Sequence, residues 1–177
     1  MKKNLCVLWE LDPASKARCE ELSRAFVGSP FLCTSFHPHI TLGCYENVSS
    51  RRLNNYVRRF AKKIEPFSVK FDELSLLNPQ RPVCLPAFDG KLKELYGKFH
   101  RRFDAYADRW TAKAIGLYTP HVSLAYRSGS LDPAALIRLT EAFSPFEAQV
   151  QGISLSWIRG ENDYEILASY PIQSSQK

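Results

Sequence analysis

Two short segments of the chain share one order of residue types. They read Pro-His-Ile-Thr-Leu and Pro-His-Val-Ser-Leu, and their polar members are His39, Thr41, His121 and Ser123. Alternate side chains of an extended strand share a face, so each histidine points the same way as the hydroxyl residue two positions later. Two such strands side by side would place two imidazoles and two hydroxyls around one phosphate-sized polar space.

This set of groups suits the opening of a phosphodiester. The reaction needs a base that takes a proton from the nucleophile and an acid that protonates the leaving oxygen. Two histidines with pKa values near 6.5 can divide these roles near neutral pH without a metal. Thr41 and Ser123 would donate hydrogen bonds to the non-bridging oxygens. Which histidine is the base and which the acid stays open.

The histidines have two other interpretations, a chance occurrence of the motif and a metal site. A single His-x-hydroxyl motif arises often by chance, but two of four histidines carry it, each after a proline and on an apolar segment. A metal site built from His37, His39 and either Cys33 or Cys44 lacks further ligands to complete a tetrahedral shell. We therefore expect neither a metal nor another cofactor.

Composition predicts one soluble domain. The chain has 177 residues, of which 45% are hydrophobic and 12% aromatic, and its net charge is +6. It is long enough to bury a sizeable core, and no apolar run reaches the roughly 18 residues of a membrane-spanning helix. Five cysteines without a Cys-x-x-Cys pair favour reduced thiols and a cytoplasmic location. The positive charge is compatible with a polyanionic partner.

Strands and helices are expected to alternate along the chain. Asp12-Pro13 and Asp132-Pro133 each begin a helix, because Asp caps free amides and Pro suits the first helical position. Apolar residues at three- and four-residue spacing predict the longest helix from about 91 to 110. The other expected elements are a helix near 50–64 and strands at 5–9, 67–77, 81–85, 146–158 and 164–170.

The order of elements repeats once. His121 follows His39 by 82 residues, and the strand near 146 resembles that near 67. The half-repeats, about 4–77 and 82–171, each contain a strand, a helix, a histidine strand, a helix and a strand. We predict an α+β fold over 1–177 with two lobes related by a pseudo-twofold axis, central antiparallel sheets and outer helices. The histidine strands would line the central cleft.

In length, motif spacing and order of elements, the chain resembles the two-histidine (2H) phosphoesterases. It is similar to the bacterial proteins called 2′-5′ RNA ligases and to the 2′,3′-cyclic nucleotide phosphodiesterases. The resemblance implies metal-independent opening of 2′,3′-cyclic phosphates or cleavage of 2′,5′ phosphodiesters, with ligation as the reverse reaction. It makes His39 and His121 catalytic and Thr41 and Ser123 phosphate-binding.

Further candidates for substrate contact come from the same resemblance and from chain position. The cyclic-phosphodiesterase branch nominates Trp9 and Tyr126, and a core position is the alternative for both. Strand alternation would turn Tyr126 away from His121 unless the strand bulges or ends first. Arg81 and Arg127 are candidates for a second phosphate.

Two other histidines and a basic helix face lie outside the two motifs. His37 shares the face of His39 and either tunes that imidazole or sits at the entry to its strand, and the entry position is favoured. We expect His100 on an exposed helix face. Six basic residues on the 51–63 helix form a solvated face or a surface that steers RNA.

The sequence thus predicts a monomeric, cytoplasmic phosphodiesterase acting on RNA termini or small nucleotides, with no membrane and no obligate protein partner. One alternative is a phosphodiesterase for cyclic or 2′,5′ signalling oligonucleotides. The other is a non-catalytic module that binds RNA ends or nucleotides.

Overall fold

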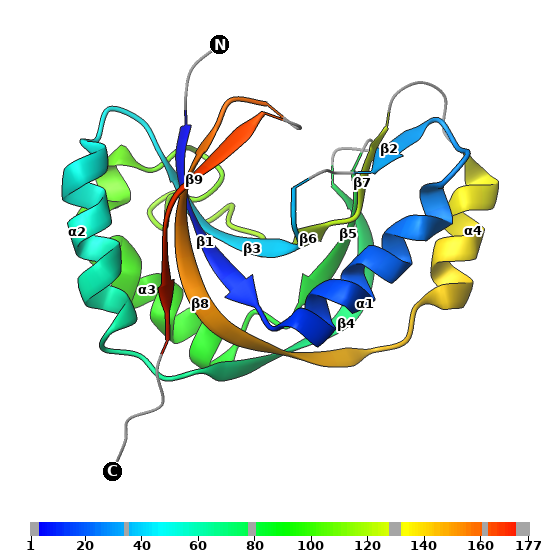
Figure 1. Ribbon diagram of the computed structural model, residues 1–177, viewed down its shortest axis with the longest axis horizontal. Coiled ribbons are helices and arrows are strands. Elements are labelled where there is room, and N and C mark those ends of the chain that lie inside the picture. The colour runs from blue at the N-terminus through cyan, green and yellow to red at the C-terminus, as the bar shows by residue number, and fades with distance from the viewer. Residues whose placement is uncertain (1–3, 34–35, 78–80, 128–131, 161–162, 173–177) are drawn as a thin grey trace.

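A mixed α+β architecture surrounds one large antiparallel sheet (Figure 1). The computed structural model describes residues 4–33, 36–77, 81–127, 132–160 and 163–172. The strands are β1 (Asn4–Leu11), β2 (Phe31–Cys33), β3 (His39–Tyr45), β4 (Phe67–Leu77), β5 (Arg81–Pro86), β6 (Val122–Ser123), β7 (Ala125–Arg127), β8 (Phe146–Ile158) and β9 (Tyr164–Pro171). The helices are α1 (Pro13–Ser23), α2 (Ser50–Ala61), α3 (Gly90–Phe103) and α4 (Pro133–Ala142). The α+β prediction is confirmed.

The sheet follows the order β3-β1-β8-β4-β5-β6, with β9 also paired to β8, while β2 and β7 form a separate small sheet. The 13-residue β8 pairs with β4 near its start and with β1 over the rest of its length. The sheet curves so that its two end strands, β3 and β6, lie beside each other (Figure 1). This closure brings the two histidine segments together.

Helices pack in pairs that cross the predicted halves of the chain. Figure 1 shows α2 with α3 on one side of the molecule and α1 with α4 on the other. The Tyr56 hydroxyl of α2 donates to the Phe99 carbonyl of α3 at 3.0 Å. On the other side, Arg138 of α4 donates to the Ala25 carbonyl just after α1. Each pair therefore takes one helix from each half, and the two-lobe symmetry stays a prediction.

Strand β1 buries both of its faces. Leu5, Val7 and Trp9 enter the main core, whereas Cys6 and Leu8 pack with Phe36 in a smaller cluster on the opposite face. A strand covered on both faces reads as a continuous apolar run, as the sequence does here.

Helix α3 ends sooner than its apolar spacing predicts. It stops at Phe103, and a short 3-10 turn covers Asp104–Tyr106. The Asp104 carboxylate then accepts the backbone amides of Lys113 and Ala114, at 2.6 and 2.9 Å, and turns the chain back. Trp110, expected on the buried face of this helix, is consequently 58% exposed.

The cysteines differ from the expected reduced set. Cys6 on β1 and Cys44 on β3 lie opposite each other in the strand register and form a disulfide. Cys19 and Cys84 are free and buried, and burial raises the pKa of the Cys19 thiol to about 12. The expectation of reduced thiols is therefore wrong for the Cys6–Cys44 pair. No helix in the described part of the chain is long and apolar enough to cross a membrane.

Candidate active site

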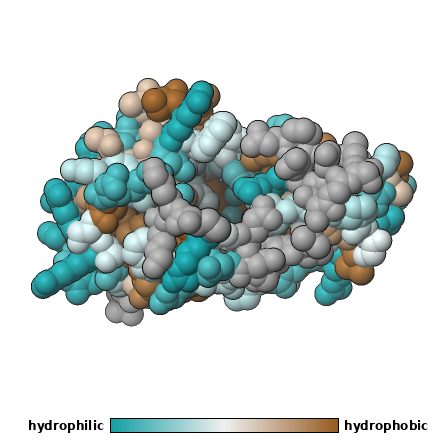
Figure 2. All heavy atoms as spheres, turned by 90° about the horizontal axis from the view of Figure 1, so that it is seen from above, coloured by the Kyte–Doolittle hydropathy of each residue, from teal (hydrophilic) through white to brown (hydrophobic). Residues whose placement is uncertain are grey.

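The two His-x-hydroxyl segments meet at one cavity of about 350 Å³. His39, Thr41, His121 and Ser123 all line it. Ile40 and Leu42 alternate with the first pair and are fully buried, as Val122 and Leu124 are beside the second. Figure 2 shows the molecule from above, where hydrophilic side chains predominate and apolar ones form smaller groups. The alternation expected from the sequence therefore presents all four polar groups to one space.

The rings of His39 and His121 are held in the same way. Nδ1 of His39 donates to the His37 carbonyl at 2.8 Å, and Nδ1 of His121 donates to the Thr119 carbonyl at 2.8 Å. A carbonyl accepts only, so Nδ1 carries the proton in each neutral ring. Nε2 is then the nitrogen with a lone pair, which is the state a general base requires.

Burial lowers the pKa of both imidazoles. It disfavours the charged ring and lowers the pKa of His39 to about 4, despite the opposing hydrogen bond to the His37 carbonyl. Burial also lowers the pKa of His121, and the nearby positive charge of Arg81 adds to the effect. Both rings are therefore neutral at pH 7 in the free protein. A bound phosphate anion would raise both pKa values and allow one ring to carry the proton that a general acid needs.

Two polar side chains form hydrogen bonds with backbone carbonyls of β3. The Tyr118 hydroxyl donates to the Thr41 carbonyl at 2.6 Å. His100 is fully buried, contrary to its expected exposure, with Nε2 2.9 Å from the Leu42 carbonyl and Nδ1 2.8 Å from Asp104. The inward turn of His100 thus ties α3 to the backbone of β3.

Arg81 and Tyr126 line the cavity together. The Arg81 guanidinium lies over the Tyr126 ring, 4.4 Å from its centroid. Simple alternation would turn Tyr126 away, but the strand is interrupted at Leu124, whose amide donates to the Pro82 carbonyl at 2.9 Å. The interruption lets Tyr126 reach the same cavity as His121.

The other two candidates for substrate contact are Trp9 and Arg127. Trp9 is fully buried, packs against Phe60 and Phe67, and does not line the cavity, because its place on β1 faces the main core. Its nomination as a substrate contact is therefore wrong. The backbone of Arg127 pairs with Phe31, but its side chain lies outside the described part of the structure.

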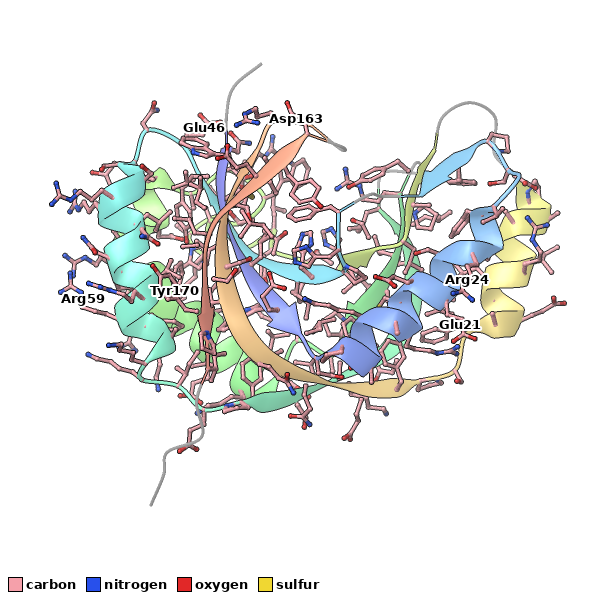
Figure 3. The ribbon with its side chains drawn as sticks, in the orientation of Figure 1. Glu21, Arg24, Glu46, Arg59, Asp163 and Tyr170 are labelled. Carbon is pink, nitrogen blue, oxygen red and sulfur yellow. A yellow bond between two sulfur atoms is a disulfide. The ribbon has the colours of Figure 1, made fainter. Side chains whose placement is uncertain are left out.

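The remaining predictions concern metal binding and the basic helix. No group of three or more His, Cys, Asp or Glu residues suited to a metal ion occurs among the residues that the structure describes. Of the proposed ligands, Cys44 is bonded to Cys6. The six basic residues of the second helix region are exposed and none lines the cavity, and Arg59 points away from the sheet (Figure 3).

A family model described as the 2′-5′ RNA ligase superfamily matches residues 38–162, which is most of the chain. The chain belongs to this superfamily. It is accordingly an enzyme of the 2H phosphoesterase kind. A comparison with curated protein sequences found no match.

Solved structures share the fold of this superfamily member. TT0787 of Thermus thermophilus aligns with a TM-score of 0.70 at 14% identity, covering 98% of this chain and 100% of that one. Escherichia coli LigT in complex with NADP+ aligns with a TM-score of 0.59 at 16% identity over 98% and 99% of the two chains. LigT in complex with 3′-AMP gives 0.59 at 17% identity over 98% and 100%.

At the site of this 2H phosphoesterase, the sequence did not predict the positions of His37 and Glu10. His37 lines the cavity instead of only marking the entry to its strand, and its Nε2 lies 2.9 Å from the carboxylate of Glu10. The sequence predicts no role for Glu10. The available signal was a lone carboxylate at the end of an apolar strand, but its neighbour across the sheet depends on register, which the sequence does not reveal.

Proposed function

We propose that the protein is a metal-independent phosphodiesterase that opens 2′,3′-cyclic phosphates at RNA ends or on nucleotides, and that it also acts on 2′,5′ phosphodiesters. The observation that carries the proposal is that His39 and His121 line one cavity together with Thr41 and Ser123. Each histidine forms a hydrogen bond from Nδ1 to a backbone carbonyl.

The cavity side chains supply the base, the acid and the hydrogen-bond donors that hydrolysis of a phosphodiester requires. Water attacks phosphorus as one imidazole takes its proton through Nε2, and the bond from phosphorus to a ribose oxygen breaks. The other imidazole, protonated in the complex, gives its proton to that oxygen. Thr41 and Ser123 donate to the non-bridging oxygens as their charge grows. Arg81 adds positive charge beside a phosphate, and the Tyr126 ring offers a face for a base.

The test is an assay with 2′,3′-cyclic nucleotides and 2′,5′-linked diadenylate in excess chelator. Turnover that survives chelation and is lost in both His39→Gln and His121→Gln is expected. Arg59→Gln, a change at an exposed residue of α2 outside the cavity, is the control and should keep full activity with these small substrates. Absence of turnover, or its loss on chelation, contradicts the mechanism.

Relative rates distinguish the alternatives. Faster cleavage of the linear 2′,5′ diadenylate than of the cyclic phosphate would favour a role on signalling oligonucleotides. Tight nucleotide binding without turnover would favour a non-catalytic binding module. In both cases, the substitutions at His39 and His121 report whether the same cavity is used.

A further inference from the structure

Of the two histidines in the His-x-hydroxyl motifs, His39 stands beside a partly buried ionic cluster and His121 does not. Glu10 lies one residue before the end of β1, and its side chain is 16% exposed. Three groups donate to it: Lys16 Nζ at 2.7 Å, Ser154 Oγ at 2.5 Å and His37 Nε2 at 2.9 Å. The donors come from α1, β8 and the segment before β3, so three parts of the chain converge on this carboxylate.

The hydrogen bonds of the cluster stabilise the ionised form of the Glu10 carboxylate. Burial alone would raise the pKa of Glu10, but the hydrogen bonds from His37, Lys16 and Ser154 overcome this effect and lower the pKa to about 2. Gly152 lies opposite Glu10 in the sheet, and a Cβ there would be 3.3 Å from Glu10 Cβ. The absence of a side chain at position 152 leaves room for the stem of the Glu10 side chain.

Glu10 acts on His39 by two routes. It is the direct partner of His39 in the β1–β3 register, so the two side chains leave the same face of the sheet. Its negative charge favours the protonated form of His39. It also accepts from the ring of His37, whose own carbonyl accepts from His39 Nδ1. Thr119, the equivalent neighbour of His121, is exposed and supplies a carbonyl alone.

We propose that Glu10 and His37 are positioning residues for His39, which hold its ring through the His37 carbonyl and stabilise the positive charge that the ring gains when it accepts a proton. This inference rests on the proposed function and deepens it. It makes His39 the base in the attack on phosphorus. Arg81 disfavours positive charge on His121 and so favours release of a proton by that ring.

The charged and titratable groups around His39 come from several elements. Glu10 lies on β1, Lys16 on α1 neutralises part of its charge, His37 precedes β3, and His121 precedes β6. Among the described groups that bear most on the pKa of His39, the carboxylate of Glu10 raises this pKa, whereas the charge of His37 or of His121 lowers it. Loss of the Glu10 charge should therefore lower that pKa further.

The experiment compares Glu10→Gln with Glu10→Asp, which keeps the charge. Glu141→Gln, the same change at an exposed position on α4, is the matched control. The assay is hydrolysis of a 2′,3′-cyclic nucleotide as a function of pH. Removing one unit charge roughly 5 Å from an imidazolium lowers kcat about 10- to 100-fold, with little change in KM. Glu10→Asp should recover most of this loss, and Glu141→Gln should show none.

The pH profile separates positioning from a purely structural role. In Glu10→Gln, the acidic limb of kcat/KM should move to lower pH, because the pKa of His39 falls. A lower rate with an unmoved limb, or an unchanged rate, would overturn the proposal. If Glu10→Gln does not fold, His37→Asn takes its place, because it leaves Glu10 with Lys16 and Ser154. It should lower kcat about 10-fold, and an unchanged kcat again overturns the proposal.

A second measurement does not depend on activity. Nitrogen-15 NMR of the imidazole rings identifies the protonated nitrogen of His39, with the signal assigned from His39→Gln. We expect Nδ1–H in the wild type and a mixture of tautomers in His37→Asn. A wild-type protein without turnover but with this tautomer shift would refute the proposed function while retaining the positioning role. An identical tautomer in both proteins refutes the positioning role.

Discussion

The neutral state of His39 should make the protein less stable in mild acid. Its pKa is about 4 in the folded protein and about 6.5 in an unfolded chain. The unfolded chain therefore takes up the proton first as the pH falls. The unfolding free energy should decline as the pH drops below about 6.5, and the decline should level off below about 4.

The expected magnitude follows from the two pKa values. Between pH 8 and pH 5, the contribution of His39 to the unfolding free energy falls by about 2 kcal/mol. Glu10 does not interfere, because its pKa falls from a reference value of 4.5 to about 2 and it titrates below this window. His121 shifts in the same direction as His39, so a comparison with a variant is needed to isolate His39.

The assay is urea unfolding of the wild type and of His39→Gln at pH 8, 6.5 and 5. The variant has no titrating group at position 39. Its unfolding free energy should therefore fall by about 2 kcal/mol less than that of the wild type over the same range. Parallel curves for the two proteins would show that His39 titrates normally in the folded state. That result would refute the argument that burial keeps this imidazole neutral.

Three further predictions concern the cavity and its supports. Thr41→Val and Ser123→Ala should each lower kcat about 100- to 1,000-fold on a cyclic nucleotide, because each removes a donor to the phosphate; equal rates would contradict the assigned role. His100→Leu leaves buried acceptors unpaired and should lower the urea-unfolding free energy by about 2–4 kcal/mol. The Cys6–Cys44 disulfide spans 38 residues, so a reductant should lower stability by about 3–4 kcal/mol, with no such effect in the Cys6→Ser, Cys44→Ser double variant.

Local patterns predicted much of the fold. The Asp-Pro signals placed the starts of α1 and α4, where Asp12 accepts the Ser15 amide at 3.0 Å and Asp132 accepts those of Ala134 and Ala135. These features depend on neighbours within one helical turn, so the sequence contains the information directly. The extent of α3 was overestimated because its end depends on Asp104 capping amides nine and ten residues further along.

Long-range packing decided what the sequence left open or assigned wrongly. The half-repeats left the pairing of the helices open. In the structure, β8 joins β1 and β4 in one continuous sheet, and the helices pair across the halves. His100 is buried because its ring reaches the Leu42 carbonyl, 58 residues away in sequence. Trp9 enters the core because β1 is covered on both faces.

By itself, the sequence determined the four polar groups of the cavity, because their alternation with buried apolar residues is a property of each strand alone. The tertiary structure decided which other groups join them. An interruption at Leu124 brings Tyr126 to the cavity beside Arg81. The β1–β3 register places Glu10 opposite His39. Register and strand breaks depend on contacts between distant segments, and those contacts exist only once the sheet has formed.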